Sequence, residues 1–144
     1  MNVKVKLVDP SLPMPEYKSA GAVAFDLYSR IDTVLKPFAP AVVPTNFIVK
    51  IPKGYMLSIA ARSSLPKYGL MVANGVGTID NDYCGENDEV GMYLINFTKK
   101  NVHIEKGQRL CQGIFHKVGT VKKFTLVKRM SSKSRGGFGT TGKK

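Results

Sequence analysis

The sequence predicts an all-β protein whose many short strands form a jelly-roll-like barrel or sandwich. Two observations carry this prediction. All 8 prolines fall between residues 10 and 66, and no long segment repeats its apolar residues with the 3.6-residue period of a helix. In addition, short apolar or β-branched runs bounded by turn residues recur along the chain. Closely spaced short strands are typical of all-β architectures.

The expected strands follow from these runs in chain order. Residues 2–8 alternate polar and apolar side chains, which is the pattern of a half-buried strand. Further strands are expected at 23–29, 45–51, 55–61, 91–97, 109–118 and 124–128. The sequences Pro-Lys-Gly at 52–54 and Glu-Lys-Gly at 105–107 predict turns that lead into two of these strands.

One domain and a short arm are expected. A length of 144 residues suits a single domain with its own core. Residues 1–130 are assigned to this β domain, and residues 131–144, rich in Ser, Lys, Gly and Thr, to a flexible C-terminal arm. The chain has no apolar run near the roughly 18 residues that a membrane helix needs, and its start lacks a signal-peptide pattern. This predicts an intracellular, cytoplasmic protein without membrane contact.

Positive charge is concentrated near the C-terminus. The formal net charge is +12; residues 1–105 carry 11 basic and 10 acidic residues, whereas residues 106–144 carry 11 basic residues and no acidic one. Such a segment is expected to meet an anionic partner, such as nucleic acid, a membrane surface or a polyphosphate. The other interpretation is a solvated basic face.

The cysteines and histidines match no metal-ligand spacing. Cys84 and Cys111 are far apart in the sequence, as are His103 and His116. Both thiols are expected to be reduced, with Cys111 buried in a strand. Neither a zinc site nor a histidine-based catalytic triad is expected.

The stretch 61–70 is a candidate phosphate-binding loop. Arg62 offers a planar fork of donors, and Ser63 and Ser64 add hydroxyl groups that can bind phosphate oxygens. Arg-Ser-Ser is common in loops, however, so taken alone the stretch also fits a polar loop after a strand.

The stretch 74–87 combines an amide, carboxylates and an aromatic ring. Its Asp-Asn-Asp sequence lacks the spacing of a calcium loop, so a β-hairpin is the better interpretation. Asn74 could recognise the edge of a base, Tyr83 could pack on a sugar, and a carboxylate could activate water. Asp82 is interpreted as a turn residue.

Gln112 and the C-terminal arm complete the candidate site residues. Gln112 lies in an apolar run, where its amide needs either backbone partners or a ligand. In the arm, glycines such as Gly139 allow the backbone to approach phosphates, while Thr140 and Thr141 supply hydroxyl groups. Phe138 could stack on a base.

The order of these stretches resembles the five motifs of the trimeric dUTPase family, the deoxyuridine triphosphate nucleotidohydrolases. The matching residues are, in order, Ala20, Gly21, Asp26 and Leu27; Arg62, Ser63 and Ser64; Gly77, Ile79, Asp80, Tyr83 and Gly85; Gly107, Arg109 and Gln112; and residues 136–142. The resemblance covers residues 20–142. Each motif is weak to moderate by itself, whereas all five in this order are a specific signal.

The chain departs from the family pattern at three places. Ala61 stands where the second motif usually has proline, and Gln108 where the fourth usually has aspartate. Arg135 lies three residues before Phe138 rather than five, and Lys133 and Ser134 occupy the positions of the usual Arg-Gly pair. The last departure leaves Lys133 and Arg135 as alternative phosphate contacts, with Arg135 preferred.

The resemblance implies a jelly-roll-like β-barrel that forms a homotrimer with shared active sites. It implies hydrolysis of dUTP to dUMP and pyrophosphate, with Mg²⁺ held by the triphosphate and water rather than by protein ligands. Asp80 would be the general base, and Asp26 would support Arg62 and the hydrated metal. The implied substrate-binding residues are Arg62, Ser63, Ser64, Asn74, Gly77, Ile79, Tyr83, Gln112, Arg135, Phe138, Gly139, Thr140 and Thr141.

Two other functions fit parts of the sequence. The dCTP deaminases have a related fold and an Arg-Ser-Ser loop, but the aspartate and tyrosine of the third motif favour dUTP hydrolysis. A nonenzymatic nucleic-acid-binding module would use the basic C-terminal third but leaves the ordered motifs unexplained. Weak nonspecific contact with nucleic acid could accompany catalysis.

Overall fold

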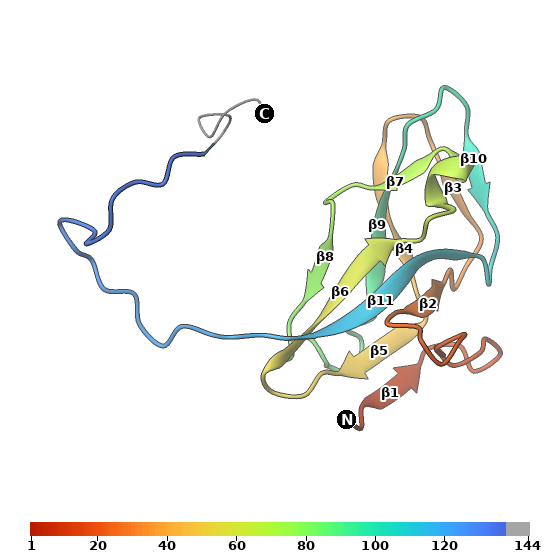
Figure 1. The fold of residues 1–144 in the computed structure, drawn as a ribbon. Helices are drawn as coiled ribbons and strands as arrows, with labels where there is room; N and C mark the ends of the chain where they lie inside the picture. Colours follow the sequence, from red (N-terminus) through yellow and green to blue (C-terminus); the bar gives the residue numbers. More distant parts are fainter. Residues whose placement is uncertain (138–144) are drawn as a thin grey trace.

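The computed structural model describes residues 1–137 and confirms the all-β fold, with one short 3₁₀ helix as the only helix in that range (Figure 1). The strands are β1 (Lys4–Leu7), β2 (Phe25–Tyr28), β3 (Thr33–Leu35), β4 (Pro40–Pro44), β5 (Phe47–Lys50), β6 (Tyr55–Ala61), β7 (Leu70–Val72), β8 (Gly77–Ile79), β9 (Gly91–Asn96), β10 (Val102–Ile104) and β11 (Arg109–Lys117). The helix is η1 (Leu65–Tyr68).

Antiparallel pairing organises these strands into four sheets. The largest has the order β2-β11-β6-β8, and a second has the order β4-β9-β7. The strands β1 and β5 form one pair, and β10 and β3 another. In the largest sheet, β11 lies between β2 and β6, so that Gln112 faces Asp26 on one side and Ala60 on the other. Three segments that are distant in the sequence therefore meet at one place.

Both predicted turns are present. At 52–54, the backbone N–H of Tyr55 donates to the carbonyl oxygen of Pro52 (3.1 Å), and Gly54 has a φ of 81°. At 105–107, the N–H of Gln108 donates to the carbonyl oxygen of Glu105 (3.0 Å), and Gly107 has a φ of 82°. Glycine suits both positions because other residues adopt a positive φ at a steric cost.

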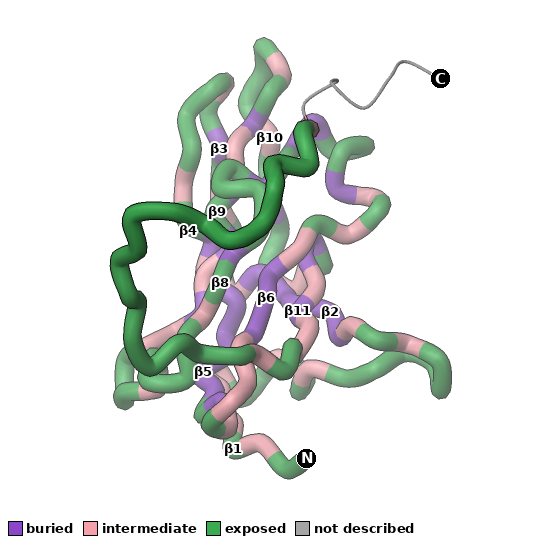
Figure 2. The backbone as a smooth tube through the Cα atoms, turned by 60° about the vertical axis from the view of Figure 1, so that its left-hand side comes forward, coloured by how far each residue is buried: buried purple, intermediate pink, exposed green. Residues whose placement is uncertain are grey.

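The core lies between the sheets, where the strands are buried (Figure 2). It is built mainly from aliphatic side chains, including the fully buried Leu27, Leu57, Leu94 and Leu110. Burial of each such side chain contributes roughly 1.5–3 kcal/mol, so these positions dominate the stability of the fold. Gly113 lets β11 approach the ring of Phe25, since a Cβ at this position would lie 2.5 Å from that ring.

Six of the seven expected strands are found. The strands β1, β2, β5, β6, β9 and β11 each lie within a run that the sequence indicated. The strands β3, β4, β7 and β10 were not predicted, and β8 lies within the stretch 74–87 that was expected to form a hairpin. Four of these five strands span only three residues, and β4 begins and ends with proline, so none shows an apolar alternation that stands out from its surroundings.

The strand expected at 124–128 is wrong. After Lys117 the chain leaves the barrel, and residues 119–136 are all exposed (Figure 1). Phe124 is 87% exposed and Leu126 is 99% exposed. A strand needs a neighbour to pair its backbone groups, and in the described chain no strand lies beside this segment. The apolar, β-branched composition of residues 124–128 is therefore not sufficient to form a strand.

The hairpin expected over 74–87 is also wrong. The strands on either side of Asn74 do not pair with each other, because β7 pairs with β9 and β8 pairs with β6. The segment around Asn74 instead carries the chain from the three-stranded sheet to the four-stranded sheet. The residues between β8 and β9 form a loop.

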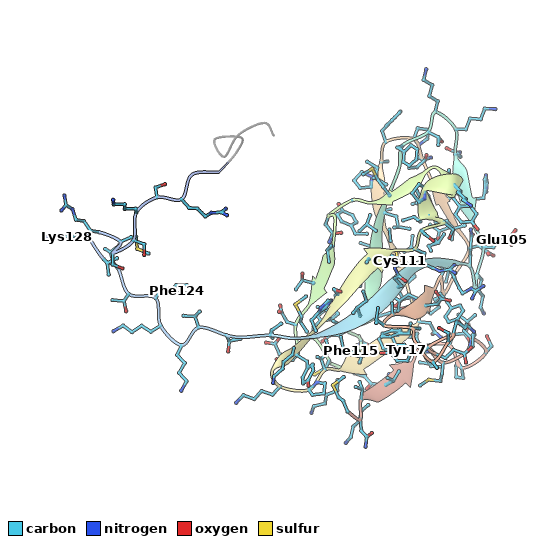
Figure 3. The ribbon with its side chains drawn as sticks, viewed as in Figure 1. Tyr17, Glu105, Cys111, Phe115, Phe124 and Lys128 are labelled. Carbon is cyan, nitrogen blue, oxygen red and sulfur yellow. The ribbon has the colours of Figure 1, made fainter. Side chains whose placement is uncertain are left out.

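The two cysteines are free, and they differ in environment. Cys111 is fully buried in β11, and this burial raises the pKa of its thiol to about 12. Cys84 is half-buried in the loop after β8. Figure 3 shows Cys111 inside the barrel, with Phe124 and Lys128 on the segment that leaves it. In the part of the chain that the structure describes, no helix is long and apolar enough to cross a membrane.

Candidate active site

A polar cavity of about 380 Å³ lies where β2, β11 and the end of β6 meet. Three cationic side chains and one carboxylate line it, so its net charge favours an anion. The lining residues are Lys18, Ala22, Ala24, Asp26, Arg62, Ser63, Arg109 and Gln112. Four of the predicted site residues, Asp26, Arg62, Ser63 and Gln112, are thereby brought together.

Asp26 organises this cavity by bridging two arginines. Its Oδ1 lies 2.8 Å from Nε of Arg62, and its Oδ2 accepts a hydrogen bond from Nη1 of Arg109 at 3.0 Å. The Asp26 side chain is only 10% exposed, so its charge needs these partners. The carboxylate thus fixes the orientation of both guanidinium groups at the cavity wall.

Arg62 has a second anchor. Its Nη1 donates to the carbonyl oxygen of Arg109 (3.1 Å), and its backbone N–H donates to the carbonyl oxygen of Leu110 (3.2 Å). These contacts tie the segment after β6 to the start of β11. A guanidinium has more N–H donors than these contacts use, so Arg62 can also bind phosphate oxygens.

Gln112 and Lys18 complete the polar wall. Nε2 of Gln112 donates to the carbonyl oxygen of Ala61 (3.1 Å), which fixes the amide beside Arg62. Lys18 is charged at neutral pH, as lysines ordinarily are, and its hydrogen bond to Glu16 raises its pKa further. The sequence left open whether the Gln112 amide has a backbone partner or faces a ligand. The structure shows that it bonds to the backbone and also lines a cavity.

The two serines after Arg62 lie at different places. Ser63 is exposed and lines the cavity, whereas the half-buried Ser64 stands just before η1. Its carbonyl oxygen accepts the backbone N–H of Lys67 (3.0 Å), and its hydroxyl makes no capping hydrogen bond to the helix. The predicted polar loop is therefore the start of a short helix whose first residue packs in the core.

The third-motif residues surround β8. Gly77 lies in the strand and is buried against β6, because a Cβ there would be 3.1 Å from Cβ of Ile59. Gly77 therefore allows close packing of the two strands, while Gly75, with a φ of 72°, is the turn glycine. Asn74 and Asp80 are exposed, and Ile79 is half-buried.

Within one chain, Asp80 is far from the polar cavity. Ile79 pairs with Leu57 near the beginning of β6, and the next residue, Asp80, lies still closer to that end because the strands are antiparallel. Arg62 comes directly after the other end of β6. The residues from Leu57 to Arg62 span roughly 17 Å of extended chain. Asn74, Asp80 and Tyr83 are absent from the lining of the cavity. The candidate residues thus form two groups that a single chain does not join.

The arm is described only in part. Arg135 is exposed, and the backbone N–H of Gly136 lies 3.4 Å from Oγ of Ser134. Phe138, Gly139, Thr140 and Thr141, which the sequence marked as candidates, lie outside the described residues.

Two cationic residues of the cavity were missing from the sequence-based set of site residues. The sequence pointed to Arg109 as a residue of the fourth motif but indicated no role for it in the site. It gave no signal for Lys18, which stands in a proline-rich loop without a pattern. Among residues 1–137, no group of three or more His, Cys, Asp or Glu side chains is placed to hold a metal ion.

Known proteins resemble this chain over nearly its whole length. A family model described as dUTPase matches residues 11–142. The deoxyuridine 5'-triphosphate nucleotidohydrolase of Finegoldia magna is 37% identical, covering 97% of this chain and 99% of the relative. The corresponding protein of Zymomonas mobilis is 41% identical, covering 92% of this chain and 90% of the relative.

Solved structures show the same fold. The dUTPase of Streptococcus mutans superposes with a TM-score of 0.75 at 28% identity, covering 83% of this chain and 98% of that one. The dUTPase of Staphylococcus bacteriophage 80alpha with dUPNHPP superposes with a TM-score of 0.85 at 25% identity, covering 98% of both chains.

Proposed function

Because this chain belongs to the dUTPase family, we propose that it hydrolyses dUTP to dUMP and pyrophosphate. The observation that carries the proposal is the match of the family model to residues 11–142, nearly the whole chain. The cationic cavity around Asp26 supports it, because a triphosphate needs several fixed cationic and hydrogen-bond donors. In the reaction, water attacks the α-phosphorus in line with the departing pyrophosphate.

The cavity would bind the phosphates. Arg62, Ser63 and Gln112 supply donors at its wall, and Ser64 supplies a further hydroxyl nearby. The pairing of Arg62 with Asp26 holds the guanidinium in place before the ligand arrives, which lowers the entropic cost of binding. From the arm, Arg135 rather than Lys133 is proposed to reach the phosphates, together with Thr140 and Thr141.

Asp80 is proposed as the general base. Its carboxylate is exposed and would accept a proton from the attacking water, which makes that oxygen a better nucleophile. The proton leaves the water as the new P–O bond forms, and the bond to the pyrophosphate oxygen breaks on the opposite side.

The residues around β8 would recognise the nucleoside. Asn74 and the backbone from Gly77 to Ile79 would bind the edge of uracil, and a tight fit would exclude cytosine and the thymine methyl group. Tyr83, 41% exposed, would pack against the deoxyribose where a ribose 2′-hydroxyl would sit. Phe138 and Gly139 would close over the base.

The polar cavity also fits a magnesium ion that arrives with the triphosphate. Each carboxylate oxygen of Asp26 contacts one arginine and keeps lone-pair capacity, so it can accept a hydrogen bond from a metal-bound water. When bound, Mg²⁺ would screen the phosphate charge that grows in the transition state. Such an ion needs no cage of protein ligands.

The separation of Asp80 from the cavity supports a homotrimer with shared active sites. Since one chain holds Asp80 near the beginning of β6 and the cavity near its end, a second chain would have to supply Asp80 to the cavity of the first. A third chain would contribute the arm. We also propose that the enzyme acts in the cytoplasm, where nucleoside triphosphates are used.

The outer face of the β4-β9-β7 sheet is a suitable surface for such assembly. Val42 pairs with Tyr93 and Met71 pairs with Ile95, and these side chains form an apolar face. Val42 is 62% exposed, Met71 51% and Tyr93 40%. Apolar strand residues clustered on one face are typical of a surface that another chain covers.

Tyr93→Lys is expected to convert the trimer into monomers and to abolish most dUTP hydrolysis. A lysine would place an unpaired charge in the apolar interface. Light scattering coupled to size-exclusion chromatography measures the mass, and Val34→Lys on β3, also an exposed apolar strand residue, is the matched control. A trimeric, fully active Tyr93→Lys variant would contradict this placement of the interface.

A nucleotide panel tests the proposed function. With Mg²⁺ present, dUTP should release pyrophosphate, whereas dCTP, dTTP and UTP should be poor substrates. Release of ammonia from dCTP would instead identify a deaminase. The exposed basic segment could give weak nonspecific binding to nucleic acid, which would show a steep dependence on salt concentration.

A further inference from the structure

Tyr83 is held by hydrogen bonds from both its backbone and its phenolic hydroxyl. Its backbone N–H donates to the carbonyl oxygen of Asp80 (3.3 Å), and its phenolic hydroxyl donates to the carbonyl oxygen of Glu89 (3.2 Å). The side chain is nevertheless 41% exposed. The ring is therefore fixed in orientation while part of its surface stays open to a ligand.

Glu89 is fixed in turn by a two-pronged ion pair. Nε of Arg30 lies 2.8 Å from its Oε1, and Nη2 of Arg30 lies 2.9 Å from its Oε2. The backbone N–H of Asn46 also donates to Oε1, at 2.7 Å. The two side chains are only 27% and 16% exposed, so water screens the pair less than an ordinary surface pair. The hydrogen bond to Glu89 raises the pKa of Arg30 above its already high ordinary value.

The partners of Glu89 belong to the rigid body of the barrel. Asn46 is 2% exposed with a φ of 68°, and its Nδ2 donates to the carbonyl oxygen of Asp9 (2.9 Å). The backbone N–H of Arg30 donates to the carbonyl oxygen of Pro44 (2.9 Å). The next residue, Val90, is fully buried, and its N–H donates to the carbonyl oxygen of Phe47 (2.9 Å). The carbonyl group of Glu89 therefore has little freedom to move.

The loop before Glu89 has few anchors of its own. Residues 80–87 are exposed except for the half-buried Cys84. Within the loop, the N–H of Gly85 donates to Oδ2 of Asp88 (2.6 Å), and that of Asp88 donates to the carbonyl oxygen of Gly85 (3.2 Å). These contacts shape a local turn without connecting it to the core. A second tie runs to β1, where Nζ of Lys6 donates to the carbonyl oxygen of Glu86 (3.2 Å) and pairs with its carboxylate, but it is Glu89 that holds the phenolic hydroxyl of Tyr83.

We propose that Glu89, held by Arg30 and Asn46, is a positioning residue that fixes Tyr83 and thereby sets the preference for deoxyribose over ribose. This inference rests on the proposed function, in which Tyr83 occupies the space of a 2′-hydroxyl. A free ring could swing aside to admit that hydroxyl. A tethered ring can do so only by breaking its hydrogen bond to Glu89. The loss of this hydrogen bond makes the binding of UTP less favourable than that of dUTP.

The test compares kcat/KM for dUTP with kcat/KM for UTP. Tyr83→Phe removes only the hydroxyl, and Glu89→Ala removes the anchor of the carbonyl group. Each is expected to lower the dUTP-to-UTP ratio about fivefold, the effect of one typical hydrogen bond. The double variant should lower it no further than Tyr83→Phe alone, because both changes break the same link. Glu89→Gln, which keeps an acceptor oxygen, should restore part of the ratio.

Glu86→Ala is the matched control, since this glutamate lies in the same loop but pairs with the surface residue Lys6. Its ratio should equal that of the wild type. An unchanged ratio in Glu89→Ala, or equal losses for both nucleotides, overturns the inference while dUTP hydrolysis by the wild type upholds the proposed function. If Glu89→Ala does not fold, an unchanged ratio in Tyr83→Phe overturns it. A wild type that does not hydrolyse dUTP overturns both proposals.

Discussion

Replacing Asp80 by asparagine is expected to lower kcat for dUTP by about a hundredfold to ten-thousandfold, the usual contribution of a general base. The amide has almost the size of the carboxylate but cannot accept the proton of the attacking water. Since Asp80 is exposed, the substitution should leave the fold unchanged. Pyrophosphate release measures the rate, and calorimetric titration with the analogue dUPNHPP measures binding, which should be close to that of the wild type.

Asp82→Asn is the matched control for this prediction. Asp82 is also an exposed carboxylate, two residues along the same loop, and it contributes its backbone carbonyl to a turn with the N–H of Cys84 (3.0 Å). Its replacement should retain nearly full turnover. Wild-type turnover in Asp80→Asn would refute the assignment of the base, and a severe loss only in Asp82→Asn would transfer that role to Asp82.

Deleting residues 131–144 is expected to reduce dUTP hydrolysis by about a hundredfold or more while leaving the barrel folded and the proposed trimer assembled. The barrel ends its last strand at Lys117, so the core keeps all its strands after the deletion. The substrate, however, would lose the closing contacts proposed for Arg135 and Phe138, and water would enter the site. Ordering an arm over a ligand costs conformational entropy, which the triphosphate contacts must offset.

A shorter deletion, of Lys143 and Lys144 alone, controls for the loss of terminal charge. It should hydrolyse dUTP at the wild-type rate, because both lysines follow the glycine-rich motif. Circular dichroism and light scattering verify that both truncated proteins fold and assemble. Full activity after removal of residues 131–144 would show that the arm has no part in catalysis.

Local sequence patterns predicted the longer strands well. Runs such as 55–61 and 109–118 contain enough apolar and β-branched residues to be recognised, and the turns at Gly54 and Gly107 follow from the sequences Pro-Lys-Gly and Glu-Lys-Gly. The segment 124–128 has the same composition but forms no strand in the described chain. Composition favours an extended backbone, whereas pairing requires a neighbour that the local sequence does not specify.

The order of the five motifs can be read from the sequence alone, and it identified the family and most of the candidate residues. Only the tertiary structure decided how these residues are grouped. Antiparallel pairing of β11 with β2 and β6 brings Asp26, Arg62 and Gln112 to one cavity, while the register of β8 on β6 holds Asp80 at the far end. Likewise, the contacts of Glu89 with Arg30 and Asn46 join segments 43 to 59 residues apart. Such distances depend on strand register, which is set by the packing of the whole chain rather than by any short stretch of it.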